Sequence, residues 1–474
     1  MKMKLTAVAT SVMLAFSIQG FANEQVDVEE MAEDIEFLQE QLRELQIKSG
    51  GANLKFNADY RVTMDSLEYK MSDGSTVKND ALFSNRLEIG MGYQPFENLI
   101  FTGLLSYNKA FGENDFNDSG MGQYDWVVNE NINENVLRVK EVGFLYLGDN
   151  FFGSELDWTG SIGRRPSTNG FIANNREGYD KAKSPLGHSI NVEFDGFSLG
   201  VKLEDLTGVD GMAAKICGGR GVSETGYGRF SSTSTDYASA DALDNVDMLG
   251  IIFTPYNDGQ YDIRMQYYYA VNMLDQDWST VNFSSTGEAL NDPTKMTQVG
   301  DLQNLTFSMQ VNGIGEFIND FLDDTVLFAS TSMSQTLPDN NNSSGFMGSN
   351  QGMLGSTDKE IGYSFWLGAT FPGFMDKDRF GLEYNHGSKY WRSFTYGEDT
   401  LIGSKIAARG NAYEVYYNVP LISDAFYLQL RYTYIDYQHQ GSNGFFGASG
   451  DPDGLGYAYV ESAQDIRAMI RYNY

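Results

Sequence analysis

The sequence predicts an all-β protein, a transmembrane antiparallel β-barrel of about 16 strands, preceded by a short periplasmic coiled-coil helix. The first observation behind this prediction is an alternation of apolar and polar residues from Asn53 to Asp65, which gives a strand one apolar and one polar face. The second is the length of that alternation. Soluble strands average about 5 to 6 residues, whereas a tilted membrane strand needs about 9 to 11. The third is that similar alternation recurs as far as Tyr474.

Residues 1–22 have the features of a secretory signal peptide. Two lysines precede an apolar run, Leu5 to Ile18, which is shorter than the roughly 20 residues of a spanning helix. Small residues around Ala22 predict cleavage after that position. No later stretch of the sequence reaches the length of a spanning helix, which argues against an α-helical inner-membrane protein.

Residues 23–51 are predicted to form a coiled-coil helix that ends in a hinge at Ser49-Gly50-Gly51. Apolar residues recur there at alternating intervals of three and four, the pattern of a coiled-coil seam. The predicted oligomerisation residues are Val28, Met31, Ile35, Leu38, Leu42 and Leu45. A helix of fewer than about three heptads is marginal alone, so the segment is expected to pack against copies of itself or to plug the barrel lumen. Coiled-coil rules favour two strands, although a short coil tied to barrels need not follow them.

Residues 52–474 are predicted to form the barrel, with about sixteen alternating segments, an even number as in bacterial single-chain barrels. The segments start near Asn53, Ala81, Leu99, Val136, Leu156, Gly187, Phe197, Asp247, Tyr261, Leu302, Thr325, Ile361, Arg379, Asn411, Phe426 and Gln464. Short connections alternate with long, glycine-rich, acidic ones. The dipeptide Asp195-Gly196 reads as a hairpin turn, and Asp205 to Val246 as one long loop that contains Cys217. Short periplasmic turns and long outer loops are typical of outer-membrane barrels.

Charge and cysteine content limit the classes of function. The chain has 33 basic and 64 acidic residues and a formal charge of -31. Without the lysines of the signal peptide, 31 basic residues face 64 acidic ones, and the formal charge is -33. Such a surplus argues against nucleic-acid binding. Cys217 is the single cysteine, so we expect neither an intramolecular disulfide nor a covalent or metal cofactor.

Several segments carry a resemblance to a known class. The chain resembles a Gram-negative outer-membrane porin, and Gly163 to Pro166, Lys183 to Pro185 and Cys217 to Gly221 resemble a little-studied family of porin-like barrels with an N-terminal coiled coil. The resemblance implies location in the cell outer membrane, contact with lipopolysaccharide, and a homo-oligomer, with a trimer favoured. The end, Arg471 to Tyr474, is similar to the signal read by the barrel-assembly machinery, with Tyr474 where porins usually have Phe.

Strand parity predicts which charged residues face the lumen. The predicted wall residues are Arg61, Arg86, Arg264, Arg379, Arg431, Arg467, Asp59, Glu88, Glu383 and Glu414, to which the same parity adds Lys55, Arg471, Asp157, Glu193, Asp262 and Asp465. Both signs are present in similar numbers, so a mixed wall is expected and the surplus of negative charge is assigned to the loops. For any one of these residues, pairing and hydration of the wall is as good an explanation as a role in selectivity.

The third long connection, Pro166 to Leu186, holds the position from which porins fold a constriction loop into the channel. Its predicted pore residues are Arg164, Arg165, Arg176, Lys181, Lys183, Glu177 and Asp180. Because basic residues exceed acidic ones in this segment, the sequence predicts an anion-tolerant constriction. The alternative is a basic surface loop that binds lipopolysaccharide phosphates or balances acidic neighbours.

Passive diffusion of small hydrophilic or ionic solutes is the predicted function. The first alternative is a structural or interaction barrel with a closed lumen, and the second is a barrel that sheathes an electron-transfer partner. An enzyme is not expected, because only His188, His386 and His439 could act as a base near neutral pH and no serine-elbow motif accompanies them.

The coiled-coil prediction has a direct test. Replacing Ile35, Leu38 and Leu42 with Asp places charges in the seam, where each apolar residue contributes roughly 1.5 to 3 kcal/mol by burial. We expect monomers in native mass measurements. An unchanged oligomer would show that other contacts hold the copies together.

Overall fold

The computed structural model describes residues 54–112, 123–125, 130–132, 135–165, 168–178, 181–223, 243–276, 296–315, 318–339, 352–375, 377–395, 400–422, 425–439 and 459–473. The expected signal peptide and the coiled-coil residues Val28, Met31, Ile35, Leu38, Leu42 and Leu45 lie outside these ranges. No helix in the described ranges is long and apolar enough to cross a membrane.

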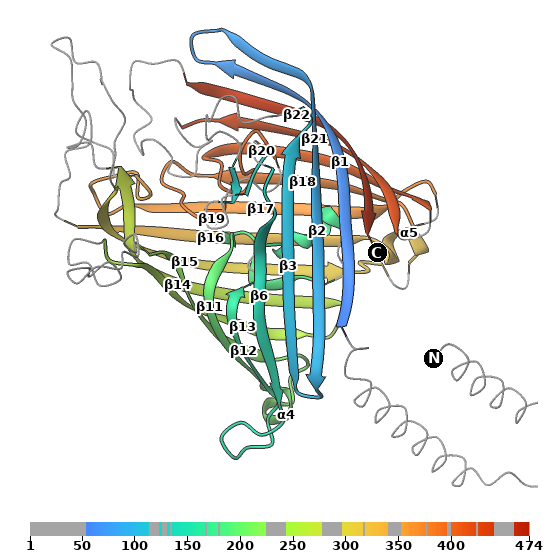
Figure 1. The fold of residues 1–474 in the computed structure, drawn as a ribbon, viewed down its shortest axis with the longest axis vertical. Helices are drawn as coiled ribbons and strands as arrows, with labels where there is room; N and C mark the ends of the chain where they lie inside the picture. The colour runs from blue at the N-terminus through green and yellow to red at the C-terminus, as the bar shows by residue number, and fades with distance from the viewer. Residues whose placement is uncertain are drawn as a thin grey trace, which may run out of the picture. The chain divides into compact units, whose positions relative to one another are not determined.

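Sixteen strands form a closed antiparallel barrel within the described residues. In chain order they are β1 (Leu54–Met71), β2 (Thr76–Phe96), β3 (Leu99–Ala110), β6 (Arg138–Gly148), β7 (Trp158–Arg165), β11 (Phe194–Lys202), β12 (Ala213–Val222), β13 (Val246–Asn257), β14 (Tyr261–Gln276), β15 (Met296–Asn312), β16 (Val326–Pro338), β17 (Ile361–Pro372), β18 (Arg379–Gly387), β20 (Gly410–Ile422), β21 (Phe426–Tyr437) and β22 (Val460–Asn473). The first and last strands pair, with Arg61 opposite Arg471, and in Figure 1 the blue β1 and the red β22 lie side by side. Closure leaves no strand edge unpaired, as a membrane requires.

Connections at the two ends of the barrel differ in length. One end carries 97–98, 149–157, 203–212, 258–260, 313–325, 373–378 and 423–425, with the short helices α4 (Glu204–Thr207) and α5 (Asp320–Asp323). The other end carries the longer 111–137, 166–193, 223–245, 277–295, 339–360, 388–409 and 438–459, together with the tight turn 72–75. The predicted alternation of short and long connections is therefore confirmed, except that β1 and β2 extend into one long hairpin.

The number of strands agrees with the prediction because two errors offset each other: the strand expected from Gly187 is not part of the wall, and one wall strand was taken as a loop. Asp195 and Gly196 lie inside β11 and are not a turn, because Gly196 has no positive φ and the alternation continues through it. The expected long loop from Asp205 contains β12, so Cys217 lies on a strand. Three glycines in β12 hide its alternation, and glycine is a weak strand former.

Burial alternates along the wall. On β1 the side chains of Asp59, Arg61 and Asp65 are buried, while Tyr60 and Met64 between them are exposed. The exposed series is apolar on other strands too, for example Phe144 at 52% and Ile162 at 65% exposure. Strand lengths run from 8 residues in β7 to 21 in β2, and a tilted membrane strand needs about 9 to 11. The wall thus has an apolar outer face and a polar inner face.

Short elements lie inside the barrel. Residues 168–193 contain β8 (Gly170–Phe171), α3 (Asn174–Glu177), β9 (Lys183–Leu186) and β10 (Ile190–Asn191), and residues 388–409 contain β19 (Phe394–Thr395). We call these two stretches the first and second inner segments. They meet where β10 pairs with β19, and Phe394 packs there with Phe194 and Tyr268 in an apolar cluster on the inner wall. A separate small pair, β4 (Gln123–Asp125) and β5 (Glu130–Asn131), lies in the 111–137 connection.

A row of four glycines crosses neighbouring strands on the inner face. Gly143 on β6 pairs with Gly163 on β7, Gly163 with Gly196 on β11, and Gly196 with Gly219 on β12. Gly163 has φ +137°, and a Cβ there would meet the carbonyl oxygen of Val142. Glycine is needed because the neighbouring backbone lies too close for a side chain and because the φ of Gly163 disfavours other residues.

Substitution along this row should disturb the barrel. Gly163→Ala combines a steric clash with a strained backbone, which costs on the order of 1 to 3 kcal/mol. The temperature at which the purified barrel unfolds should fall. Gly92→Ala on β2 is the matched control, because a Cβ there meets nothing within 4 Å. Equal unfolding temperatures for the two variants would contradict a special role for the row.

Candidate functional site

The first inner segment leaves the wall between β7 and β11 and docks on the other side of the barrel. Its helix α3 has two buried charged side chains, Arg176 and Glu177, at 6% and 3% exposure. The wall residues that contact them belong to β1, β20, β21 and β22, and all have inward parity. The segment therefore crosses the interior.

The carboxylate of Glu177 lies among four guanidinium groups. Its Oε2 is 3.6 Å from Nη1 of Arg61 and 3.5 Å from Nη1 of Arg471. Its Oε1 accepts a hydrogen bond from Nε of Arg176 at 3.1 Å and is 3.9 Å from Nη1 of Arg431. Arg471 also donates to the backbone carbonyl of Glu177 at 3.3 Å. A buried charge persists only when it is paired, and this cluster meets that condition.

A second charged cluster joins the two inner segments. Lys405 donates to Glu414 at 2.5 Å and to Glu383 at 2.6 Å, while Arg176 lies 3.6 Å from Glu414. Trp366 donates its indole N–H to Glu383 at 2.9 Å. Both segments thus bind the same wall carboxylate, that of Glu414.

Most of the predicted wall residues lie on the inner face and are paired. Three do not belong to the buried wall: Lys55 is exposed near the start of β1, Asp157 lies in the 149–157 connection and pairs with Lys202, and Glu193 ends the first inner segment. Asp59 accepts from Arg471 at 2.9 Å and lies 3.8 Å from Arg86. Glu88 lies 3.3 Å from Arg86 and from Lys140. Three further wall residues are arginines. Arg467 pairs with Asp65, and Arg379 is half-buried. Arg264 pairs with Asp262 at 2.6 Å and lies over the ring of Phe171. The interior is therefore a network of opposite charges.

The basic residues predicted for the constriction are held in different ways. Arg164 pairs with Asp195 at 3.1 Å, Lys183 pairs with Glu141, and Lys181 is exposed. The side chain of Arg165 and the residue Asp180 lie outside the described part of the chain. Pairing reduces the positive field that a basic loop would otherwise project into the lumen.

Neutral contacts also hold the first inner segment. His188 is fully buried and lies 2.7 Å from the Ser330 hydroxyl on β16 and 2.9 Å from the Ser364 hydroxyl on β17. Burial lowers the pKa of His188 to about 3. The ring is therefore neutral near pH 7 and is too weak a base to activate a serine. Its contacts anchor the segment.

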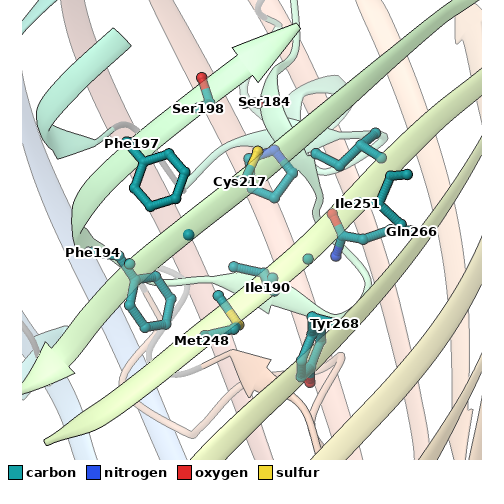
Figure 2. Close-up of a pocket in the computed structure, with 15 residues that line it drawn as sticks. Ser184, Ile190, Phe194, Phe197, Ser198, Cys217, Met248, Ile251, Gln266 and Tyr268 are labelled. Carbon is teal, nitrogen blue, oxygen red and sulfur yellow. The ribbon is translucent and has the colours of Figure 1, made fainter. Parts of the chain in front are cut away.

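An apolar contact supports the same segment nearer its own strands. Figure 2 shows Ile190, Phe194, Met248 and Tyr268 around a cavity of about 60 Å³ beside Cys217. Next to this cavity, Gln266 accepts from the Leu186 N–H at 3.0 Å and donates to Ser189 at 2.9 Å. The segment therefore packs on β11 to β14 at one side and forms ion pairs with β1 and β20 to β22 at the other.

Sequence reasoning identified Arg176 and Glu177, considered His188 only as a possible base, and missed Lys405 and the whole second inner segment. Lys405 is a lone lysine between small residues in a long connection, and nothing in that pattern indicates burial. Among the described residues, no group of three or more His, Cys, Asp or Glu is arranged to hold a metal ion.

A closed wall of sixteen strands with a long loop folded across its interior defines a porin-like β-barrel. The chain belongs to the family described as protein of unknown function (DUF3373), whose model matches residues 76–474. No curated protein matches the chain in sequence.

Solved outer-membrane proteins are similar in fold. An anion-selective porin from Comamonas acidovorans is 10% identical with a TM-score of 0.47, covering 89% of this chain and 99% of that one. OprB of Pseudomonas putida is 13% identical with a TM-score of 0.46, and the match covers 89% of this chain and 94% of OprB. OmpF of Salmonella typhi is 11% identical with a TM-score of 0.45, and the match covers 89% of this chain and 98% of OmpF. Similarity at this level does not indicate which solutes this chain binds or admits.

Glu177 has a measurable role in docking. Glu177→Gln removes the charge shared by four arginines, and breaking a buried ion pair from one side costs about 3 to 5 kcal/mol. The first inner segment should then be cleaved after Lys181 by trypsin much faster than in the unchanged protein. Glu461→Gln, which removes one partner of an exposed pair with Lys70, is the control and should leave cleavage unchanged. Equal cleavage of all three proteins would show that apolar contacts alone hold the segment.

Proposed function

We propose that this protein is an outer-membrane porin through which small hydrophilic or ionic solutes diffuse passively, in a lumen narrowed by its inner segments. The wall supports a membrane location, because its outer face is apolar and its closed ladder leaves no unpaired edge. The inner face supports an aqueous role, since charged and hydroxyl side chains alternate with the outward apolar ones.

One observation carries this proposal. Glu177 of α3 reaches Arg61 on β1 and Arg471 on β22, several strands around the wall from β7 and β11, so the first inner segment is fixed across part of the lumen. Two anchored ends make a constriction of defined shape, which is what a size-selective pore needs. Because most charges at this site are paired, we expect solute size to determine mainly which solutes pass. Lys181 should add a modest preference for anions.

Several further features are part of the proposal. The short-turn end faces the periplasm and the long loops face outward, where they contact lipopolysaccharide. Residues 28–45 assemble the chain into a homo-oligomer, for which the porin resemblance favours a trimer. The last strand, which pairs with both β1 and β21, is the element that the barrel-assembly machinery recognises. Small solutes, not nucleic acids, pass through the lumen, and the barrel catalyses no reaction.

A closed interaction barrel is the second candidate, and a specific observation favours it. Inner-face side chains such as Ser308, Thr433 and Arg471 have 0% exposure, so the described interior is filled around them. For the protein to act as a porin, a water-filled pathway must run beside the inner segments, where they do not fill the barrel. A sheath for an electron-transfer partner needs a wider lumen than this filled interior provides.

Planar-bilayer recording separates the two candidates. The purified protein should give small, discrete conductance steps, and deletion of Asn174–Gly178 should enlarge them, because the segment no longer reaches the opposite wall. The heat-modifiable shift of the barrel on a gel checks that the variant is folded. A folded wild type and a folded deletion variant that both fail to conduct would reject the porin and leave the closed barrel.

Lys181→Glu, measured in the same bilayers under a salt gradient, tests the selectivity part of the proposal. The zero-current potential should move toward cations, more strongly at low ionic strength. Lys202→Glu, at the last residue of β11 next to the short connections of the other end, is the control. Identical potentials for all three proteins would place Lys181 outside the conduction pathway.

A further inference from the structure

The second inner segment contains a buried cation without a partner in the described part of the chain. Arg392 is 8% exposed, and its Nε and Nη2 atoms are inaccessible and have no acceptor within hydrogen-bond distance. Its position is fixed, because its backbone N–H donates to the Ser334 hydroxyl on β16 at 3.0 Å. The neighbouring Trp391 is held as well, through an indole hydrogen bond to the Ile406 carbonyl at 2.9 Å.

Burial lowers the pKa of Arg392 to about 10, so the guanidinium remains charged near neutral pH. A buried charge is stable only with a counter-charge and with acceptors for its N–H groups. Arg61 and Arg431 deeper in the barrel have carboxylate partners, and Arg392 differs from them in this respect.

Other basic residues lie in the same part of the fold as Arg392. Arg409 is 1% exposed and donates from Nη1 to the Lys389 carbonyl at 3.3 Å, and Lys389 lies in the turn Ser388–Trp391 that directly precedes Arg392. The backbone N–H of His439, after the end of β21, donates to the Arg409 carbonyl at 3.2 Å, and the Nδ1 of His439 is buried without a partner.

The electrostatic effects agree with this arrangement. Burial and then the charge of Arg392 lower the pKa of Arg409. Burial and then the charges of Arg409, Lys389 and His386 lower the pKa of His439. The charge of Arg392 thus disfavours the charged form of Arg409, and the charge of Arg409 disfavours that of His439.

We propose that Arg392, with Arg409 and His439 beside it, binds a small oxyanion at the long-loop end of the barrel, with inorganic phosphate as the simplest example. Two guanidinium groups and a ring nitrogen can supply several charge-assisted donors to tetrahedral oxygens. The depth of Arg392 favours a free anion over the phosphate of a lipid headgroup, which would have to enter with its sugar. Binding of this kind is separate from passage through the lumen.

Phosphate binding to the purified full chain in detergent tests the proposal, by equilibrium dialysis and by thermal unfolding at constant ionic strength with chloride as the reference anion. Phosphate should bind and should raise the unfolding temperature. Arg392→Gln should weaken binding about tenfold or more, because a charged hydrogen-bond donor is lost. Without phosphate, this variant should be at least as stable as the wild type, since an uncompensated buried charge has been removed.

Arg220→Gln is the matched control, because Arg220 lies in an exposed pair with Asp247 on the wall. It should retain phosphate binding and the thermal shift. Equal binding by Arg392→Gln and wild type would overturn the proposal, as would a wild type that does not bind phosphate. A shift produced by lipopolysaccharide but not by phosphate would also overturn it and would assign the site to a lipid headgroup.

The result does not depend on conductance. A barrel that binds phosphate at Arg392 but does not conduct would reject only the proposed function. A barrel that conducts but shows no phosphate effect at Arg392 would reject only the anion site.

Discussion

The interior depends on the attraction between the Glu177 carboxylate and the arginines of the wall. Parity in a closed barrel places Arg61, Arg431 and Arg471 on the same inner face, and β1, β21 and β22 are neighbours, so their charges repel. Wall carboxylates offset part of this repulsion, and α3 contributes Glu177 to the cluster. The first inner segment is thus a counter-ion for the wall as well as an obstruction in it. The shape of the lumen and the stability of the wall cannot be changed independently.

The two inner segments are joined by different kinds of contact. Glu414 binds both Arg176 and Lys405, so each segment's ion pair alters the charge that the other experiences. His188 adds neutral hydrogen bonds, and the apolar pairing of Ile190 with Phe394 adds a contact that salt does not screen. The mixture makes the interior less sensitive to ionic strength than ion pairs alone.

The sequence was sufficient to predict the closed barrel and most of the inner face, because both depend on local alternation and on parity; the strand number agreed only because one extra and one missed strand offset each other. It was not sufficient for β12, where glycines hide the alternation that side chains would otherwise display. Arg176 and Glu177 were identified from their position in the third long connection, yet their partners were not, since those partners lie as far away as Arg471. Lys405 and Arg392 were missed for the same reason: burial in a long connection depends on tertiary packing and leaves no periodic pattern.

The docking of Glu177 has a consequence for the order of assembly. Two of its partners, Arg61 and Arg471, come from the first and last strands of the wall, which become neighbours only when the barrel closes. Contacts between residues so distant in sequence form late, because the loop entropy must be overcome first. The contacts of Glu177 with these two arginines are therefore absent until the final seam of the wall forms. The same event that closes the wall thus completes the charged cluster around Glu177, so the full fixing of the inner segment follows closure of the wall.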